Sequence, residues 1–506
     1  MKKLIYIFSL AAAILIITSC SEDFLDKRPT SYISIEDYNE TKAINPEIAA
    51  ATLRGIYNQM VTAGIGGTSS QEDFGHKSFD LMSDLLSSDM AQVTGAYNRF
   101  VSFANLLWTT DKSINLPNYT AWRFYYTIIK SANLIIDGNG GNEAVPTTDA
   151  EKAAMGQAKA IRAFAYFYLS QYYVVEYDPN KEVLPIYTEV LQPAQAKSKL
   201  SEVYDLMISD LNDAISLMAN FSRDNKAFVN ADVAKGLLAY VYASMGESSK
   251  NVMAMELANE VINSGTYMLM DADEVTGGFT KLTTPGWMWG FDITDANNLG
   301  LVSWHGFMDA YSYSYQAVGN NRGIDLGLYD QIDPNDIRKQ QFGKVTFGVG
   351  TYTAGVSPHI PAGKFYNLNK VSMGQRPILD DYVYMRVAEM YLLSAELAAV
   401  EGDDMAAKTT LKMLLAKRFD DAGDYAYVDA LSGQALIDEI VFQTKIELLA
   451  EGKSYLLMKR RKLTNTRGTN HMNLKGQSFA HNDPRLTFEI PQRELTDNPL
   501  LNSGNK

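Results

Sequence analysis

The chain has 506 residues, and its 59 Asp and Glu outnumber its 45 Lys and Arg, which gives a formal net charge of −14 at pH 7. A surface this acidic repels the phosphates of nucleic acids, so we expect no nucleic-acid partner. The single cysteine excludes an internal disulfide and a metal site with several cysteine ligands.

The N-terminus has the pattern of a lipoprotein signal peptide. Two lysines precede an apolar run over residues 4–17, which is too short to cross a membrane because a span needs about 20 apolar residues. Small residues then lead into Cys20. We predict removal of residues 1–19 and acylation of Cys20, which anchors firmly when several acyl chains are attached. The alternative is an ordinary signal peptide with a leftover thiol.

Apolar residues recur at helical spacing in six stretches. These predicted helices are 153–173, 200–218, 229–245, 254–262, 384–400 and 405–418. The third and fourth, and likewise the fifth and sixth, form a helix, a glycine turn and a second helix, with Gly246 and Gly402 in the turns. Such hairpins resemble tetratricopeptide units, and the alternative is two unrelated helical hairpins. The pattern predicts a mainly α-helical fold.

Two regions differ from the predicted helices in composition and in the spacing of their apolar residues. Residues 264–380 are rich in glycine and aromatic residues, and within them 311–315 and 345–352 alternate like short strands. A second loop-like region covers residues 64–118. Binding residues concentrate on loops that a rigid scaffold positions, so we expect the ligand site in these two regions.

Sugar recognition needs aromatic faces against the C–H side of a pyranose, and amide or guanidinium groups for its hydroxyls. The two loop regions offer both, and their predicted ligand-binding residues are Tyr97, Asn98, Arg99 and Trp108 in one, and Trp287, Trp289, Trp304, Tyr311, Tyr315, Asn320 and Arg322 in the other. Trp287 and Trp289 share a face if they lie in a strand. The alternative is that the tryptophans fill the core beneath the loops, because tryptophan is highly buried on average.

Several motifs, spread over nearly the whole mature chain, carry a family resemblance. They are Cys20–Pro29, Ala121–Asn133, Ala158–Tyr173, Met385–Glu396, Glu447–Gly452 and Ile490–Pro499, of which Met385–Glu396 is the most specific. Together they resemble the SusD/RagB family of Bacteroidetes outer-membrane nutrient-binding lipoproteins. Ser454 and Leu457 stand where that family usually has arginine and aspartate, which puts in doubt the ion pairs of those two side chains.

The resemblance implies a mainly α-helical domain over residues 20–506 with four tetratricopeptide-like units and a variable binding face. Its helical scaffold would cover about residues 40–263 and 381–463, with a loop- and short-strand-rich insert at about 264–380 and a C-terminal segment at about 464–506. It also implies a partner, a TonB-dependent SusC-like transporter, and a glycan or peptide ligand. An acidic stretch after Cys20 resembles a surface-export signal, so we expect a lipid-anchored protein on the outer face of the outer membrane.

Catalysis is not expected. The sequence has no zinc-protease helix motif, no nucleophile elbow and no phosphate-binding loop, and no cofactor or metal site is predicted. The charged residues of the family motifs, such as Arg386, Glu389, Glu396, Glu447 and Glu451, are interpreted as structural pairs. The alternatives left open are an oligopeptide-binding lipoprotein, a surface scaffold for other proteins, and a glycosidase, which needs only two carboxylates.

Overall fold

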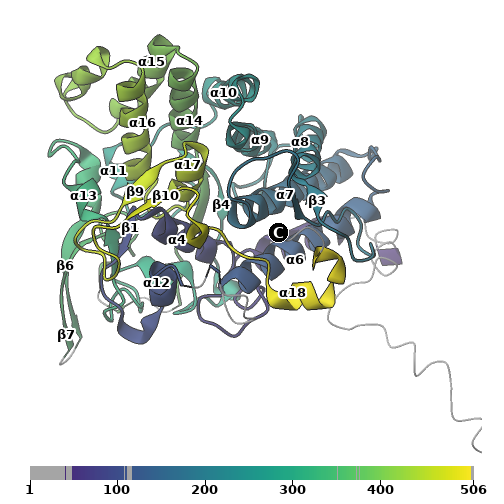
Figure 1. Ribbon diagram of the computed structural model, residues 1–506, viewed down its shortest axis with the longest axis horizontal. Helices are drawn as coiled ribbons and strands as arrows, with labels where there is room; N and C mark the ends of the chain where they lie inside the picture. Colours follow the sequence, from purple (N-terminus) through teal and green to yellow (C-terminus); the bar gives the residue numbers. More distant parts are fainter. Residues whose placement is uncertain are drawn as a thin grey trace, which may run out of the picture. The chain divides into compact units, whose positions relative to one another are not determined.

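Packed helices dominate the computed structural model of the chain (Figure 1). The structure describes residues 40–41, 48–107, 109–110, 117–349, 352–371, 373–374 and 377–502. The predicted signal peptide, Cys20 and Trp108 lie outside these residues, so what was predicted for them stays a prediction. From Ala50 onward the chain forms one compact unit.

The long helices follow one another in space, each packed against the next (Figure 1). They are α6 (Pro117–Gly138), α7 (Asp149–Tyr173), α8 (Leu200–Leu217), α9 (Ala231–Met245), α10 (Ser248–Asn263), α14 (Val387–Val400), α15 (Asp404–Leu415) and α16 (Gln434–Glu447). α10 packs against α14 although 123 residues separate the end of one from the start of the other, so the two predicted hairpins are neighbours. The predicted mainly α-helical fold is confirmed.

Glycine turns separate the helices of both predicted hairpins. Gly246, directly after α9, has φ 70°, and Gly402, after α14, has φ 86°. Glycine accepts this left-handed conformation without the steric cost that a Cβ atom brings. Each turn lets the next helix fold back against the previous one, so α9 packs on α10 and α14 on α15.

Between α10 and α14 the elements are short. They are α11 (Ala272–Val275), β4 (Trp287–Phe291), α12 (Trp304–Met308), β5 (Arg322–Ile324), α13 (Leu326–Tyr329), β6 (Gly343–Val349), β7 (Tyr352–Ile360) and β8 (Tyr382–Arg386). All the strand pairs are antiparallel: β4 with β8, β6 with β7, and β5 with β1 (Met90–Gln92). Of the predicted strand at 345–352, residues 345–349 lie in β6, whereas Tyr352 is the first residue of β7.

The alternation at 311–315 does not make a strand of that segment. Asp309 explains why, because it holds a tight turn there. Its carboxylate accepts hydrogen bonds from the amide of Tyr311 at 2.7 Å and from the hydroxyl of Ser312, and its carbonyl accepts one from the hydroxyl of Ser314 at 2.5 Å. Serine side chains that bond to nearby backbone compete with strand pairing.

Shorter elements complete the compact unit. The helices are α3 (Ile48–Gln59), α4 (His76–Ser87), α5 (Val101–Ala104), α17 (Ser454–Arg460) and α18 (Gln492–Asp497), and the strands are β2 (Glu182–Leu184), β3 (Ser198–Lys199), β9 (Thr464–Thr466) and β10 (Ser478–Ala480). One-turn 3-10 helices lie at η2 (Ala96–Asn98), η3 (Asp295–Asn297), η4 (Ile337–Gln341), η6 (Pro484–Leu486) and η7 (Pro499–Asn502), and η5 (Ala422–Ala430) is longer. α17 packs on α4, so the C-terminal part closes against the N-terminal part.

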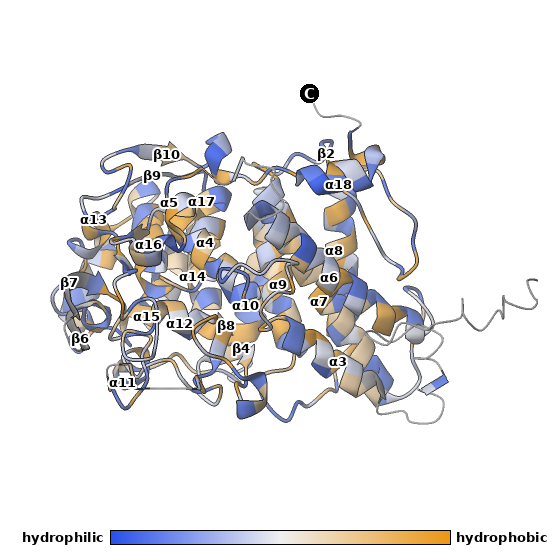
Figure 2. Ribbon diagram, turned by 90° about the horizontal axis from the view of Figure 1, so that it is seen from below, coloured by the Kyte–Doolittle hydropathy of each residue, from blue (hydrophilic) through white to orange (hydrophobic). Residues whose placement is uncertain are grey.

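Apolar faces of the helices form the core, as the hydrophobic colouring along α14, α16 and α7 shows (Figure 2). Small residues on α14, such as Ala395 and Ala399, allow α15 to pack closely, because an alanine lets two helices approach. Nearer α4 the core is aromatic: His76, Tyr168 and Tyr384 meet there at centroid distances of 4.7 to 5.4 Å.

A buried ionic cluster joins the end of β8, the end of α16 and the loops after α15 and α16. Glu447 accepts hydrogen bonds from Arg386 at 3.0 Å and from Arg418 at 2.8 Å, and Glu451 accepts two from Arg386 at 2.8 Å. Glu396 pairs with Arg460 at 2.7 Å. The structural interpretation of these motif residues is therefore confirmed. Glu389, in the first turn of α14, accepts a hydrogen bond at 2.7 Å from the amide of Arg386, the residue directly before the helix.

In the described part of the chain, none of the helices is both long enough and apolar enough to span a membrane. Within the same residues, His, Cys, Asp and Glu side chains do not gather in groups of three or more that could hold a metal ion.

Candidate ligand-binding loop face

A short antiparallel ladder brings together two loops that are far apart in the sequence. β1 and β5 pair over three residues each. Beyond the ladder, the amide of Ala96 and the hydroxyl of Thr94 both donate to the carbonyl of Gly319, at 3.2 and 2.6 Å. The loop 94–100, which follows β1, therefore lies beside the loop 309–321, which precedes β5.

An aromatic column runs from this surface into the core. Tyr97 is 67% exposed, and its ring meets the ring of Tyr315 edge to face, with centroids 5.8 Å apart. The guanidinium of Arg99 lies over the same Tyr315 ring at 5.6 Å. Below, Tyr315 stacks on Phe307 at 4.7 Å, and Phe307 stacks on Phe74 at 5.1 Å. Tyr97 and Arg99 therefore stand on a rigid support at the outer end of the column.

The backbone of the 94–100 loop is strained where it presents these residues. Tyr97, Asn98 and Phe100 have φ values of 62°, 53° and 57°, a left-handed conformation that costs about 1 kcal/mol or more for most non-glycine residues. Buried partners hold the loop in this shape. The Glu72 carboxylate accepts a hydrogen bond from the amide of Phe100 at 2.9 Å, and the Asn320 amide donates to the carbonyl before Tyr97 at 2.8 Å.

The exposed side chains of this loop have free hydrogen-bonding capacity. The Tyr97 hydroxyl, the Asn98 amide and the Arg99 guanidinium make no hydrogen bond to any described residue, and the Nε atom of Arg99 is shielded from water. An aromatic ring beside an amide and a guanidinium is a combination that binds sugar hydroxyls as well as the ring face of a sugar.

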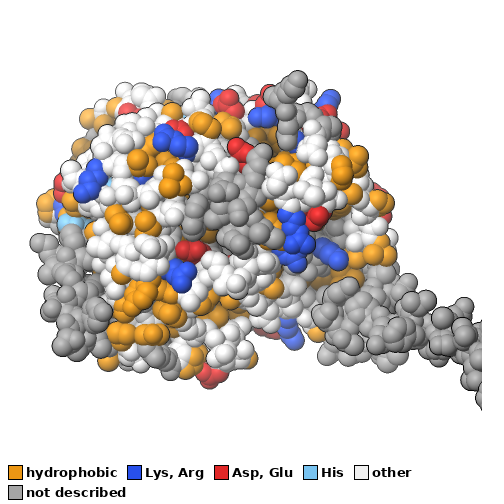
Figure 3. Space-filling view, turned by 60° about the horizontal axis from the view of Figure 1, so that its bottom comes forward, with side chains coloured by type: hydrophobic (Ala, Val, Ile, Leu, Met, Phe, Trp, Pro, Cys, Tyr) orange, Lys and Arg blue, Asp and Glu red, His pale blue; other side chains and the backbone are white. Residues whose placement is uncertain are grey.

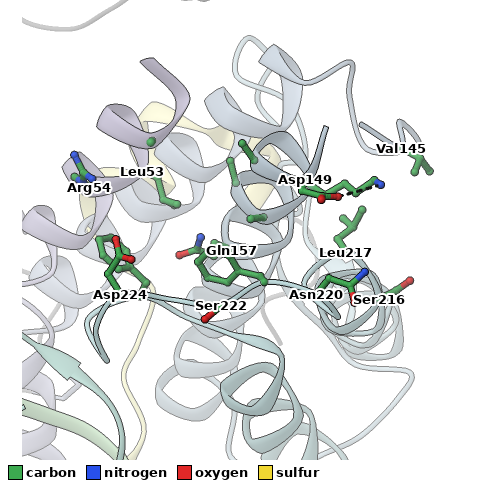
Figure 4. Close-up of a pocket in the computed structure, with 17 residues that line it drawn as sticks. Leu53, Arg54, Val145, Asp149, Gln157, Ser216, Leu217, Asn220, Ser222 and Asp224 are labelled. Carbon is green, nitrogen blue, oxygen red and sulfur yellow. Dashed lines mark ion pairs between the residues drawn. The ribbon is translucent and has the colours of Figure 1, made fainter. Parts of the chain in front are cut away.

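A separate cavity of about 560 Å³ lies between α3, the first turns of α7 and the chain after α8 (Figure 4). Apolar side chains such as Leu53 and Phe221 line it, together with Arg54, Asp149 and Asp224, so its rim carries charges of both signs. The sequence analysis did not predict this cavity. Three segments far apart in the sequence form it, and none of them contains a recognisable binding motif.

Gln157 is the buried polar group of this cavity (Figure 4). Its Oε1 atom accepts a hydrogen bond from the hydroxyl of Tyr57 at 2.8 Å, and that hydroxyl accepts one from the amide of Val229 at 2.9 Å. These bonds fix the amide so that Oε1 faces Tyr57. The Nε2 group makes no hydrogen bond to the described residues and is available to a ligand in the cavity.

Two family models match the chain. One, described as starch-binding associating with outer membrane, matches residues 23–243, and the model of the SusD family matches residues 359–505. The chain belongs to the SusD family. The resemblance stated from the sequence motifs is thereby confirmed.

Solved SusD-family structures share the fold. A SusD-like carbohydrate-binding protein from Bacteroides vulgatus has a TM-score of 0.74 at 22% identity, and the match covers 90% of this chain and 96% of that one. Surface glycan-binding protein A from Bacteroides thetaiotaomicron, in complex with laminarihexaose, has a TM-score of 0.64 at 16% identity, and the match covers 89% and 97% of the two chains. At these identities the likeness establishes the fold.

Two curated SusD-family relatives match part of the chain. A SusD-like protein from Bacteroides ovatus is 26% identical over 237 residues, which are 46% of this chain and 38% of the relative. The SusD-like protein P25 from Formosa agariphila is 23% identical over 266 residues, which are 51% of this chain and 46% of the relative. Each match therefore spans less than half of the curated relative.

In this SusD-family chain, three predicted ligand-binding tryptophans lie in the core. Trp287, Trp289 and Trp304 are 0%, 1% and 3% exposed. β4 pairs with β8, and both faces of β4 are covered; the indole of Trp289 donates to a backbone carbonyl at 3.2 Å and packs on Tyr384. No ring face is left for a ligand, so the prediction of direct contact is wrong for these three residues, and their alternative role in the core is the observed one.

Asn320 and Arg322 are buried as well, and they support the site from below. The guanidinium of Arg322 donates to the side-chain oxygen of Asn320 and to the carbonyl of Arg99 at 3.3 Å, and lies over the ring of Phe100 at 5.1 Å. Burial lowers the pKa of Arg322 to about 9, although Glu72 opposes this shift. Neither side chain reaches the surface, which corrects the prediction that they contact the ligand directly.

Of the other predicted residues, Tyr97, Asn98, Arg99 and Tyr311 keep their candidate role. Tyr97, Asn98 and Arg99 are on the surface or partly exposed, whereas Tyr315 supports them and is itself 4% exposed. Tyr311 is partly exposed and meets Tyr366 edge to face at 6.2 Å. Figure 3, turned to bring the α12 side forward, shows apolar side chains among neutral ones, with acidic side chains few and scattered.

Proposed function

We propose that this chain is a nutrient-binding surface lipoprotein that captures an oligosaccharide or polysaccharide on the loop face. The observation that carries the proposal is the Tyr97 site. An exposed ring, an amide and a guanidinium with free hydrogen-bonding capacity stand on a strained loop that the core holds in place. Strain of this kind concentrates at ligand sites, because the rest of the structure must compensate for its cost.

The family supports the proposal. The matched model is described as starch-binding associating with outer membrane, and a protein of the same fold was solved with laminarihexaose bound. In this proposal Cys20 carries the lipid anchor, and the captured glycan passes to a TonB-dependent SusC-like transporter in the outer membrane. The protein itself binds without cleaving.

Calorimetry on soluble protein that starts at Ser21 tests the proposal. The protein is titrated with plant, host and microbial polysaccharides, and each sample is then checked for shortened products. We expect saturable binding without cleavage, which Tyr97→Ala weakens about tenfold, the usual effect of removing an aromatic anchor. Tyr427→Ala is the matched control, because Tyr427 is also exposed (43%) and lies on η5 in the helical part.

Other results would contradict this proposal. Shortened chains would indicate a glycosidase. If Tyr97→Ala and Tyr427→Ala changed glycan binding equally, the loop face would be excluded as the binding site. Retention of other proteins with no response to any glycan or peptide would favour a surface scaffold.

The cavity beside α3 favours a second candidate function, capture of an oligopeptide. Apolar walls, a fixed amide donor at Gln157 and rim charges of both signs suit a peptide, which carries apolar side chains, carbonyl acceptors and charged groups together. A mixed peptide library tests it. Peptide binding that Gln157→Leu abolishes and Tyr97→Ala leaves intact would establish this function, and no peptide binding would exclude it.

A further inference from the structure

Acidic residues avoid the loops around Tyr97. In the whole chain about one residue in nine is Asp or Glu. Four segments contain only two such residues, Asp309 and Asp325, and both are buried, at 0% and 4% exposure. The segments are 93–107, 309–325, 359–374 and 464–480.

These four segments lie together. Hydrogen bonds join the first to the second, as described above, and the amide of Gly374 donates to the carbonyl of Tyr311 at 3.2 Å, which joins the third to the second. The fourth reaches the first and the second: the guanidinium of Arg467 donates to the carbonyl of Ala104 at 2.5 Å, and the Asn470 amide donates to the carbonyl of Ile324 at 2.9 Å. Together they form one surface, which we call the carboxylate-poor face.

Three guanidiniums of this face have no carboxylate of a described residue at ion-pair distance, although the buried Lys364 pairs with Glu451 and His471 with Asp325. Among the described residues, Arg99 has no ion-pair partner, and neither have the buried guanidiniums of Arg322 and Arg467. Arg467 donates instead to the carbonyl of Ala104 at 2.5 Å. Lys370, which is exposed, lies over the ring of Tyr366 at 4.3 Å.

Burying a guanidinium without a counter-charge is costly, and proteins normally pair such groups. Burial lowers the pKa of Arg467 to about 10, with Arg485 acting in the same direction and Asp325 opposing, and lowers that of Arg322 to about 9, with Glu72 opposing. Both groups still carry a positive charge at neutral pH. Their field and that of Arg99 add at the same surface, whereas the rest of this acidic chain repels anions.

We infer that the glycan bound on the loop face is anionic, with carboxylate or sulfate groups that pair with Arg99 while a neighbouring sugar ring packs on Tyr97. The inference rests on the proposed glycan-binding function and narrows its substrate class. Its physical reason is complementarity: a guanidinium forms two parallel hydrogen bonds to a carboxylate or sulfate, and the missing acidic side chains remove the competing internal partner.

The test compares probes of equal length and different charge, using the soluble chain from Ser21. They are oligogalacturonate, which carries carboxylates, sulfated carrageenan oligosaccharide, and laminarihexaose, which is neutral. Affinity is measured by calorimetry at 50 and 300 mM NaCl. We expect binding of at least one anionic probe that weakens several-fold at the higher salt, because salt screens exposed charges.

Two charge-removing variants complete the test. Arg99→Gln is expected to weaken anionic binding ten- to a hundredfold, the range for losing a hydrogen bond to a charged group. Lys181→Gln is the control, because Lys181 is exposed and lies between α7 and α8. This substitution removes the same unit of charge as Arg99→Gln. Circular dichroism and thermal unfolding confirm that both variants fold.

Each outcome separates the inference from the function on which it rests. Laminarihexaose bound at the Tyr97 site, with neither anionic probe bound, would overturn the anionic preference and leave glycan binding intact. Equal loss in Arg99→Gln and Lys181→Gln would overturn the role of Arg99. No response to any of the three probes, or to the wider glycan panel, would overturn both. The carboxylate and sulfate arms show which anion the site prefers.

Discussion

The ammonium group of Lys453 lies 3.5 Å from the carboxylate of Glu389, and both side chains are buried. Lys453 directly precedes Ser454, which stands at the position where arginine is usual in the family. The ammonium group also donates to the carbonyl of Tyr384 at 3.0 Å. The residue beside that position thus makes a buried ion pair, and burial raises the pKa of Glu389 although Lys453 opposes this shift.

Lys453→Met is therefore expected to destabilise the protein by about 3–5 kcal/mol, because it leaves Glu389 buried without its counter-charge. Urea unfolding at pH 7 measures the loss. The double variant Lys453→Met with Glu389→Gln should recover much of it, since a neutral pair has no isolated charge to bury. If the double variant loses the sum of the two single effects, the pair makes no coupled contribution.

Stability should fall as the pH is lowered from 6.5 to 4, and His76 is one cause. Burial lowers its pKa to about 4; Asp80 opposes the shift, whereas Lys453 and Lys77 reinforce it. The unfolded chain, with a histidine pKa near 6.5, binds the proton first, so acid favours unfolding, by about 3 kcal/mol at most for this group. Unfolding free energies at pH 7.5, 5.5 and 4.5 should fall less steeply in His76→Gln, and parallel curves would contradict this.

A second loss of folding stability is expected at lower pH. Burial opposes ionisation of Glu451, but Arg386 and Lys364 lower its pKa to about 2. Because the folded pKa is below the unfolded value, the stabilisation is present above pH 4.5 and is lost as the pH falls toward 2. Glu451→Gln should remove this dependence and also lower stability at pH 7. The same pH series, extended to pH 2.5, checks both expectations.

Tyr97 and Trp287 should respond in opposite ways to replacement by alanine. Trp287→Ala removes a fully buried indole and is expected to cost about 3–5 kcal/mol of stability. Tyr97→Ala removes an exposed ring and should change stability by less than about 0.5 kcal/mol while it weakens glycan binding. Thermal unfolding and calorimetry on both variants give the two readouts. A stability loss in Tyr97→Ala equal to that of Trp287→Ala would show that Tyr97 is a structural residue rather than a ligand-binding one.

Asn320→Ala should lower both the stability of the protein and its affinity for the glycan. Its amide joins the carbonyl of Ala96 to the guanidinium of Arg322, and removal leaves both buried groups without this partner, at a cost of about 1–3 kcal/mol. The 94–100 loop then loses its support, so affinity for the glycan falls although Asn320 does not touch the ligand. Unchanged affinity in a destabilised variant would show that the loop holds its shape without Asn320.

The six helical segments were predictable from sequence periodicity, whereas the burial of the tryptophans was not, for a physical reason. Periodicity is local, so the segment 153–173 identified most of α7, and 384–400 identified α14 within three residues. Burial depends on distant neighbours. Phe164 of α7, 125 positions before Trp289, packs on the ring of Trp289, and Phe279 packs on the ring of Trp287. Local alternation at 345–352 predicted one strand and so identified most of β6, but not its pairing with β7.

The candidate site was predictable in its chemistry but not in its assembly. Tyr97 and Tyr315 were each chosen for their residue type, in separate clusters. That they touch follows from the pairing of β1 with β5, which joins positions 225 apart, as Thr94 and Gly319 show. No periodic pattern marks a three-residue ladder. The absence of carboxylates in four loops was readable in the sequence, but only the contacts between them make it a single surface.

In the β1–β5 ladder, the bonds that hold the two loops together are distinct from the side chains that the loops present to a ligand. The bonds of the ladder and those from Ala96 and Thr94 to Gly319 end on backbone atoms, so they do not depend on the residues at Tyr97, Asn98 and Arg99. Those three positions can therefore be exchanged without loss of register. The same framework can serve as a host for other recognition surfaces, and a library randomised at these three positions should yield folded proteins with new sugar preferences.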